Sequence, residues 1–335
     1  MPHAIRRALL VLGCVCFARA AAAQGATPII GLITKTTTNP YFVKMREGAE
    51  AAAKTNGAKL LSGAGRSDGD NAGQVTAMEN MIAAGARVIM ITPSDAKAII
   101  PAIRKARAKG ILVIALDSPT DPAEATDALF ATDNYRAGTL IGAYAKRLLG
   151  AKPAKIATID LLPGHPVGAQ RHNGFLKGFG LTAPEAKVNT LGRPAEVVCM
   201  GDSYGDQAKG QTLMENCLQK NPDINVVYAV NEPSAAGASK ALKAAGKDKS
   251  VVLVTVDGGC QGVRDVGTGA FAATAQQYPL KMAELGVAAG VAFVKSGKKP
   301  TGYTDTGVAL IAGTAIPGVE SKDVKTGMKL CFGKK

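Results

Sequence analysis

Short apolar, β-branched runs alternate with longer amphipathic segments along this chain. In the first such pair, at residues 28–60, the run PIIGLIT predicts a buried strand. The segment after it predicts a helix, because Phe42, Met45, Ala49 and Ala53 recur at helical spacing and Gly57 stands where that helix should end. The chain therefore opens with a strand followed by a helix, the basic unit of a parallel sheet.

The same alternation continues through the rest of the chain and predicts an α/β fold with mostly parallel sheets and helices on both faces. The strand and helix series starts twice, at PIIGLIT and again at AKIATID, which predicts two Rossmann-like lobes. The late strand FAATAQ and the helix over 279–296 that follows it are surplus to the second series, so we expect them to return to the first lobe. The predicted parts are an N-terminal lobe of 24–132 plus 279–305, a C-terminal lobe of 133–278 plus 306–335, and a three-segment hinge with crossings near 131–134, 276–279 and 303–307.

The N-terminal 23 residues have the layout of a cleaved secretory signal. Arg6 and Arg7 precede a short apolar run, and small residues from Ala20 to Ala23 follow it, so we expect cleavage after Ala23. Lipidation of Cys14 is the alternative, because the residues around it loosely resemble a lipoprotein signal. No other stretch approaches 18 apolar residues, so the mature chain is expected to be soluble outside the cytoplasm.

The positive charge of the chain does not indicate a nucleic-acid-binding protein. The formal net charge is +14, and it falls to +11 when Arg6, Arg7 and Arg19 leave with the signal. The lysines are scattered along predicted helix faces and are not gathered beside exposed aromatic residues, as they would be in a nucleic-acid-binding surface. Export from the cytoplasm argues against nucleic acid as well.

Four cysteines remain in the mature region: Cys199, Cys217, Cys260 and Cys331. An even number in an oxidising compartment favours disulfides, and four cysteines allow three pairings. We predict the pairs 199–217 and 260–331, because the first two flank one strand–loop–helix segment and the last two would tie down the tail. Their spacing does not fit a zinc site, and we expect no metal or other cofactor.

Polar and aromatic residues gather at the predicted carboxyl ends of the strands, where open α/β sheets bind their ligands. Carboxylates, amides and a guanidinium form a mixed set of donors and acceptors suited to hydroxyl groups, and aromatic rings can cover the apolar faces of a sugar. Each strand-end Asp or Asn has a structural alternative as a helix cap, and Arg171 could instead be a surface ion-pair partner. The candidate ligand-binding residues are Asn39, Tyr41, Phe42, Asp117, Ser118, Asp133, Arg171, Asn231, Asp257 and Gln277.

The order of several segments resembles the periplasmic sugar-binding proteins of ribose-type ABC transporters. These segments are TNPYF, LDSPTDP, ATDNYRAG, QRHNGFLKGF, VNEPSAAGA, VTVDGG and TAQQYPLKM, and they cover essentially the whole mature chain. The resemblance implies that Tyr41 and Phe42 stack on a sugar. It also implies that Asp117, Arg171, Asn231, Asp257 and Gln277 hydrogen-bond its hydroxyls, with Asn39 in the same corner.

Two departures from the ribose pattern change the expected ligand. Ser118 stands where ribose binders usually carry Arg, and Tyr41 stands where Phe is common. The segment AEVVCMGDSYGDQAKGQTLMENCLQKNPDINVVYAVNEP, with LDSPTDP and VDGGC, is more similar to the fructose-binding branch of the family. We therefore expect fructose or a related ketose, hexose or pentose as the ligand.

The resemblance further implies a periplasmic, monomeric protein that delivers its ligand to a membrane ABC permease and its ATPase. An enzyme on the same scaffold is the first alternative, but the sequence has no G-x-S-x-G elbow and no His/Glu metal motif. A sugar-sensing repressor would carry a helix-turn-helix where this chain has an export signal. A sensor that presents a sugar or an autoinducer to a receptor remains open, because it would expose the same closed surface.

Overall fold

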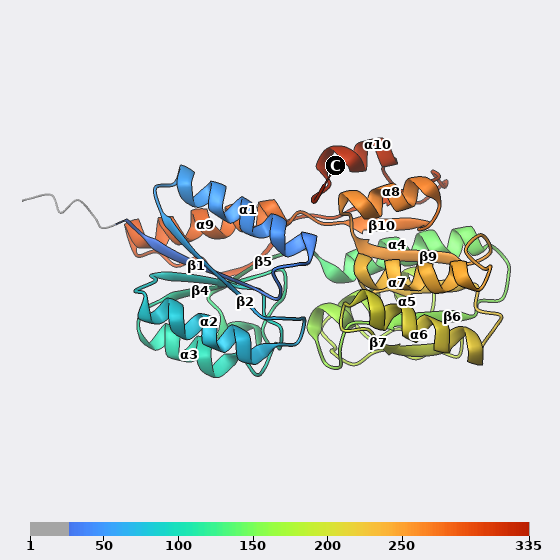
Figure 1. Cartoon of the computed structure of the whole chain (residues 1–335), viewed down its shortest axis with the longest axis horizontal. Helices are drawn as coiled ribbons and strands as arrows, with labels where there is room; N and C mark the ends of the chain where they lie inside the picture. The colour runs from blue at the N-terminus through green and yellow to red at the C-terminus, as the bar shows by residue number, and fades with distance from the viewer. Residues whose placement is uncertain (1–26, 335) are drawn as a thin grey trace, which may run out of the picture.

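The computed structural model describes residues 27–334, which form two α/β lobes lying side by side (Figure 1). The sheet of the first lobe has six parallel strands in the order β11-β5-β4-β3-β1-β2. The strands are β1 (Ile29–Thr34), β2 (Lys59–Ala64), β3 (Val88–Ile91), β4 (Leu112–Leu116), β5 (Ala128–Ala131) and β11 (Gly302–Asp305).

The sheet of the second lobe repeats this arrangement, with the order β12-β10-β9-β8-β6-β7. Its edge strand β12 runs antiparallel to β10, and its other pairs are parallel. The strands are β6 (Ile156–Asp160), β7 (Val197–Asp202), β8 (Val226–Ala229), β9 (Val252–Asp257), β10 (Ala273–Gln276) and β12 (Ala309–Ala312).

Helices cover both faces of each sheet and bury its β-branched residues. In the first lobe, α1 (Pro40–Thr55) and α9 (Pro279–Ser296) pack on one face, and α2 (Asn71–Ala83) and α3 (Ile100–Ala108) pack on the other. In the second lobe, α4 (Asn134–Leu149) and α5 (Pro166–Phe179) face α6 (Gln207–Lys220), α7 (Glu232–Ala244) and α8 (Cys260–Thr268) across the sheet. The short helices η1 (Ala123–Ala125) and α10 (Val324–Leu330) complete the chain.

The chain passes between the lobes three times: between β5 and α4, between β10 and α9, and between β11 and β12. The predicted fold class is confirmed, and the late helix α9 returns to the first lobe as expected. The late strand FAATAQ does not return with it: it is β10, which stays in the second sheet between β9 and β12 because it pairs with both. The strand that joins the first sheet is β11, from the stretch after α9. The predicted signal at 1–23 and Cys14 lie outside the described residues. Within residues 27–334, no helix has the length and apolar character needed to cross a bilayer.

Two disulfides join segments within the second lobe. Cys199 on β7 pairs with Cys217 on α6, and Cys260 at the start of α8 pairs with Cys331, which follows α10. The structure thus contains both pairs predicted from the sequence. Both bonds lie on the second lobe, so neither directly restrains the first.

Candidate functional site

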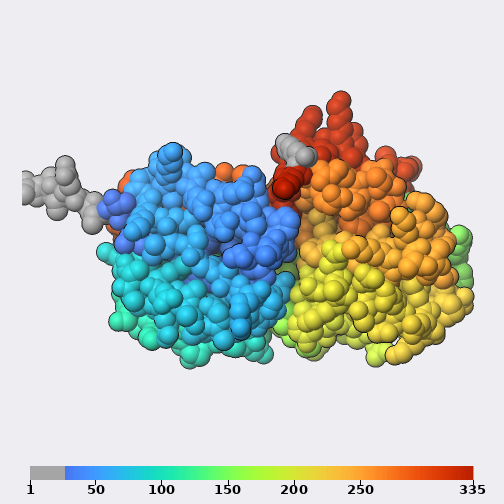
Figure 2. Space-filling model, in the orientation of Figure 1, coloured from blue at the N-terminus to red at the C-terminus, as the bar shows by residue number. Residues whose placement is uncertain are grey.

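The facing ends of the two lobes enclose a cavity. The lobes touch along these ends in the space-filling view (Figure 2), and the lining comes from both of them. Eight of the ten residues predicted from the sequence line it. The lining residues are Lys35, Asn39, Tyr41, Phe42, Asp68 and Asp117 from the first lobe, and Leu161, Val167, Arg171, Asn231, Asp257 and Gln277 from the second lobe and the hinge.

Two carboxylates occupy equivalent places in the two lobes. Asp117 follows β4, the fourth strand of the first series, and Asp257 ends β9, the fourth strand of the second. They are two of the three non-glycine residues with positive φ among residues 27–334, at 64° and 139°. Such backbone conformations cost about 1–3 kcal/mol each and gather at functional sites. Both carboxylates are also buried, so the fold holds them in the cavity despite these costs.

The first-lobe carboxylate is held by two hydroxyl donors. The Tyr41 hydroxyl donates to Asp117 Oδ1 at 2.9 Å, and Ser118 Oγ donates to Oδ2 at 3.0 Å. Burial and the neighbouring Asp117 raise the pKa of Tyr41 well above its usual value, so its hydroxyl keeps its proton and remains a donor. Ser118 is buried and does not line the cavity. Its predicted contact with the ligand stays a prediction, and in the structure the turn after β4 directs its side chain back to the Asp117 carboxylate.

The aromatic pair follows from the start of α1. Asn39 caps this helix, with Oδ1 accepting from Tyr41 N at 2.9 Å, and this places Tyr41 and Phe42 in its first turn. Their rings meet edge to face, with centroids 5.3 Å apart. Asn39 therefore caps the helix through its side-chain oxygen, as the structural alternative predicted, and it also lines the cavity. Asn231 acts in the same way at α7, where its Oδ1 accepts from Ser234 N at 3.0 Å.

Arg171 is a buried residue of α5 and not a surface ion-pair partner. Its Nε donates to Asn134 Oδ1 at 2.8 Å and its Nη1 donates to the Val230 carbonyl at 2.9 Å. Nη1 also lies 3.6 Å from Asp257 Oδ1. A side chain at Gly138 on α4 would collide with the Arg171 carbonyl oxygen, so α4 and α5 pack backbone to backbone and fix the position of the guanidinium.

Asp257 is held by two hydrogen bonds and lies beside the charge of Arg171. Gln277 Nε2 donates to Oδ1 at 3.0 Å and Glu232 N donates to Oδ2 at 3.2 Å. Burial raises the pKa of Asp257 to about 6, and the charge of Arg171 limits this rise. The Glu232 side chain accepts from Gly258 N at 2.8 Å and Gly259 N at 3.0 Å, which fixes the turn between Asp257 and α8.

Two charged cavity residues were missed by sequence reasoning. Lys35 directly follows β1 and Asp68 lies in the loop after β2, so the strand-end rule that found Asp117 also applied to them. Lys35 Nζ lies 3.3 Å from Nε2 of His165, whose pKa is lowered by burial and by Lys35, so this imidazole is neutral. The loop around Asp68 reaches the second lobe, where the Asp68 carboxylate lies beside Gly205.

Two buried oxygens in this lining, Asp68 Oδ1 and Gln277 Oε1, have no hydrogen-bond partner within residues 27–334. Buried polar atoms in native proteins are almost always hydrogen-bonded. Carboxylate and amide oxygens accept hydrogen bonds, so a molecule that carries several hydroxyl donors would complement them. The cavity therefore offers bound hydroxyls both acceptors and, at Arg171 and Lys35, cationic donors.

The structure places Asp133 at the start of α4, outside the group of predicted residues that it brings together. Its side chain caps α4 by accepting from Arg136 N at 2.9 Å, and it does not line the cavity. The segment from β5 to α4 is itself an interlobe crossing, so the chain has left the strand end before residue 133. The next residue, Asn134, is buried and accepts from Arg171, so it supports the site from behind.

A family described as the periplasmic binding protein domain matches residues 30–299. The chain belongs to this family. It is 31% identical to the ribose import binding protein of Bacillus subtilis over 76% of this chain and 78% of that protein. It is 29% identical to the D-allose-binding periplasmic protein of Escherichia coli over 80% of this chain and 85% of that protein. These relatives are binding components, and the family assignment agrees with the non-enzymatic role predicted from the sequence.

Solved structures give the same result. An ABC transporter solute-binding protein of Actinobacillus succinogenes with bound D-allose has a TM-score of 0.75 at 28% identity, over 86% of this chain and 98% of that one. A second, from Agrobacterium vitis with bound D-fucose, has a TM-score of 0.76 at 28% identity, over 87% and 97% of the two chains. The predicted resemblance to sugar-binding proteins of ABC transporters is confirmed at the level of the family.

Proposed function

We propose that this protein captures a monosaccharide in the interlobe cavity and delivers it to a membrane ABC permease with its ATPase. The observation that supports this most is the lining of the cavity, where carboxylates, amides and a guanidinium from both lobes surround an aromatic pair. A ligand can drive closure only through contacts that it makes in the closed state. Because Asp117 and Asp257 come from different lobes, one small molecule that contacts both would hold the lobes together.

The lining suits a sugar better than an apolar or purely ionic ligand. Tyr41 and Phe42 are 4% and 5% exposed, and they supply an apolar surface beside the carboxylate of Asp117. Sugars have apolar ring faces and hydroxyls at their edges, and both features find partners here. We infer that Asn39, Tyr41, Phe42 and Asp117 bind one side of the sugar, and that Arg171, Asn231, Asp257 and Gln277 bind the other.

Fructose or a related ketose, hexose or pentose remains our proposed ligand. The residue after Asp117 is Ser118, which carries no charge and donates a hydrogen bond to that carboxylate. The Tyr41 hydroxyl donates a second hydrogen bond to the same carboxylate. The names of the relatives add D-ribose and D-allose as the competing sugars to test. We further propose that the mature protein is a periplasmic monomer whose lobes comprise 24–132 with 279–305 and 133–278 with 306–335.

A thermal-shift screen of the mature protein with D-fructose, D-ribose, D-allose and D-glucose tests the proposal. A ligand that binds only the native state, present at a hundred times its dissociation constant, stabilises it by about 2.7 kcal/mol, or roughly 5 °C in melting temperature. The shift should disappear in Asp257→Asn and persist in Asp223→Asn, because Asp223 is an exposed partner of Lys155. A folded protein that shows no shift with any monosaccharide would contradict the proposal.

A further inference from the structure

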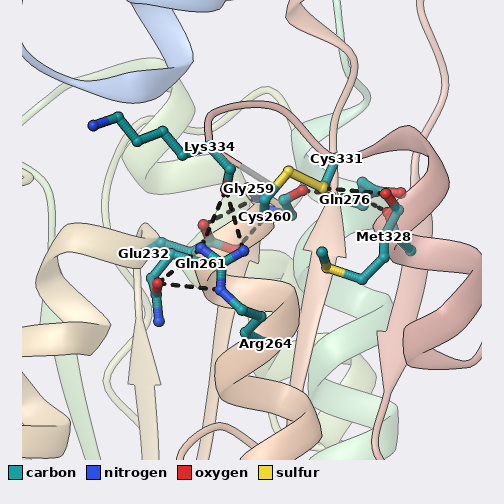
Figure 3. Close-up of a disulfide and its surroundings, with 11 residues drawn as sticks. Glu232, Gly259, Cys260, Gln261, Arg264, Gln276, Met328, Cys331 and Lys334 are labelled. Atoms are coloured by element: carbon teal, nitrogen blue, oxygen red, sulfur yellow. Dashed lines mark hydrogen bonds between the residues drawn. A yellow bond between two sulfur atoms is a disulfide. The ribbon is translucent and has the colours of Figure 1, made fainter.

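The tail, defined here as residues 331–334, is fixed to the second lobe by several bonds. Cys331 forms the disulfide with Cys260 at the first residue of α8 (Figure 3). Cys260 N donates to the Phe332 carbonyl at 2.8 Å, and both terminal nitrogens of Arg264 donate to the Lys334 carbonyl at 3.2 Å. The anchors offset the entropy that so short a segment loses when it is ordered.

The side chain of Phe332 packs on the other lobe. It is 4% exposed and belongs to the hydrophobic core cluster formed by β1, β3, β4, α1 and α9. Its ring meets that of Tyr41 edge to face, with centroids 5.4 Å apart and an interplanar angle of 82°. Figure 2 shows the tail at the boundary between the lobes, beside the first-lobe surface. Phe332 is therefore covalently tied to one lobe and buried in the other.

This position couples Phe332 to the opening of the cleft. Separation of the lobes would carry the tail away with α8, because the disulfide and the hydrogen bonds hold it there. The rings of Phe332 and Tyr41 would then lose their mutual contact and become more exposed to water. Tyr41 also donates a hydrogen bond to Asp117 in the cavity. The contact between Phe332 and Tyr41 therefore involves a residue of the proposed sugar site.

We propose that the tail is a latch, in which the Cys260–Cys331 disulfide holds Phe332 against Tyr41 and thereby favours the closed arrangement of the lobes. The inference rests on the proposed function in one respect: closure is what retains the sugar. Phe332 is a positioning residue, since it contacts Tyr41 and does not line the cavity. An edge-to-face pair of this kind contributes enough to change a closing equilibrium by about tenfold.

Calorimetry and stopped-flow dissociation with D-fructose, D-ribose and D-allose test the latch. We expect Phe332→Ala and the double variant C260S/C331S each to raise the dissociation constant about tenfold, mainly through faster release. Adding Phe332→Ala to the double variant should cause no further loss, because the disulfide acts through that ring. The matched control C199S/C217S removes the other disulfide and should leave affinity unchanged even if its melting temperature falls.

Two results would overturn the latch. One is wild-type affinity in Phe332→Ala, and the other is an equal loss of affinity in C199S/C217S and C260S/C331S. Phe332→Ala keeps all four cysteines, so the test stands even if C260S/C331S fails to fold. A wild-type protein that binds none of the three sugars would count against the proposed function instead. The latch is then decided by X-ray scattering of the ligand-free protein, where Phe332→Ala should have a larger radius of gyration, and identical scattering from the two proteins would refute it.

Discussion

Replacement of Arg171 by lysine tests the site at its most constrained residue. The guanidinium uses two of its nitrogens on protein acceptors, the Asn134 side chain at 2.8 Å and the Val230 carbonyl at 2.9 Å. It also lies 3.6 Å from Asp257 and limits the rise in the pKa of that carboxyl. A lysine keeps the charge but has one compact ammonium group, which cannot reproduce the planar fork of donors.

The expected loss can be worked from these contacts. At least one buried oxygen would be left without its donor in Arg171→Lys, at a cost of about 1–3 kcal/mol in the closed, water-excluding state. This corresponds to about a ten- to hundredfold increase in the dissociation constant for the sugar. Arg171→Ala should cost at least as much, since it removes the charge beside Asp257 as well.

Isothermal titration calorimetry of both variants, with melting curves to verify folding, measures the effect. The matched control is Arg46→Lys, because Arg46 is a partly exposed residue of α1 whose Nε lies 3.7 Å from Glu50 Oε1, and it does not line the cavity. We expect this control to bind like the wild type. If Arg171→Lys also retains wild-type affinity while folded, the geometry of the guanidinium is irrelevant to binding and the assignment of the second-lobe half of the site is wrong.

Three further predictions concern the residues around this site. Tyr41→Phe removes a donor to buried Asp117 and should lower the free energy of unfolding by about 1–3 kcal/mol in urea titrations, whereas unchanged stability would argue against that hydrogen bond. Hydroxyls that donate to Asp257 favour its ionised form and lower its pKa from about 6, so binding should release protons and strengthen as pH rises from 5 to 7. Calorimetry in buffers of different ionisation enthalpy detects these protons, and a pH-independent affinity would contradict the assignment. Gly138→Ala should separate α4 from α5 and weaken both stability and binding, while Gly150→Ala, in open space at a positive φ, should affect stability alone.

The sequence determined the features that depend on neighbouring residues. Hydrophobic periodicity predicted the alternation of strands and helices, because a buried strand and an amphipathic helix each need their pattern locally. It also placed Asp117 and Asp257 at the cleft, since a residue at the end of a parallel strand, or directly after it, must lie at the carboxyl edge of its sheet. The return of α9 to the first lobe followed from counting these units, but the same count wrongly sent β10 with it, and the strand that joins the first sheet is β11.

Tertiary structure decided what depends on side-chain direction and on contacts between distant segments. Ser118 and Asp133 follow strands as Asp117 does, but the turn after β4 directs one to a carboxylate and the interlobe crossing makes the other a helix cap. No local pattern marks Phe332 as a partner of Tyr41, since that contact exists only because a disulfide carries the tail to α8 and the lobes meet beside it. Sequence periodicity fixes which face of an element is buried, whereas the packing of two lobes fixes which buried side chains share one cavity.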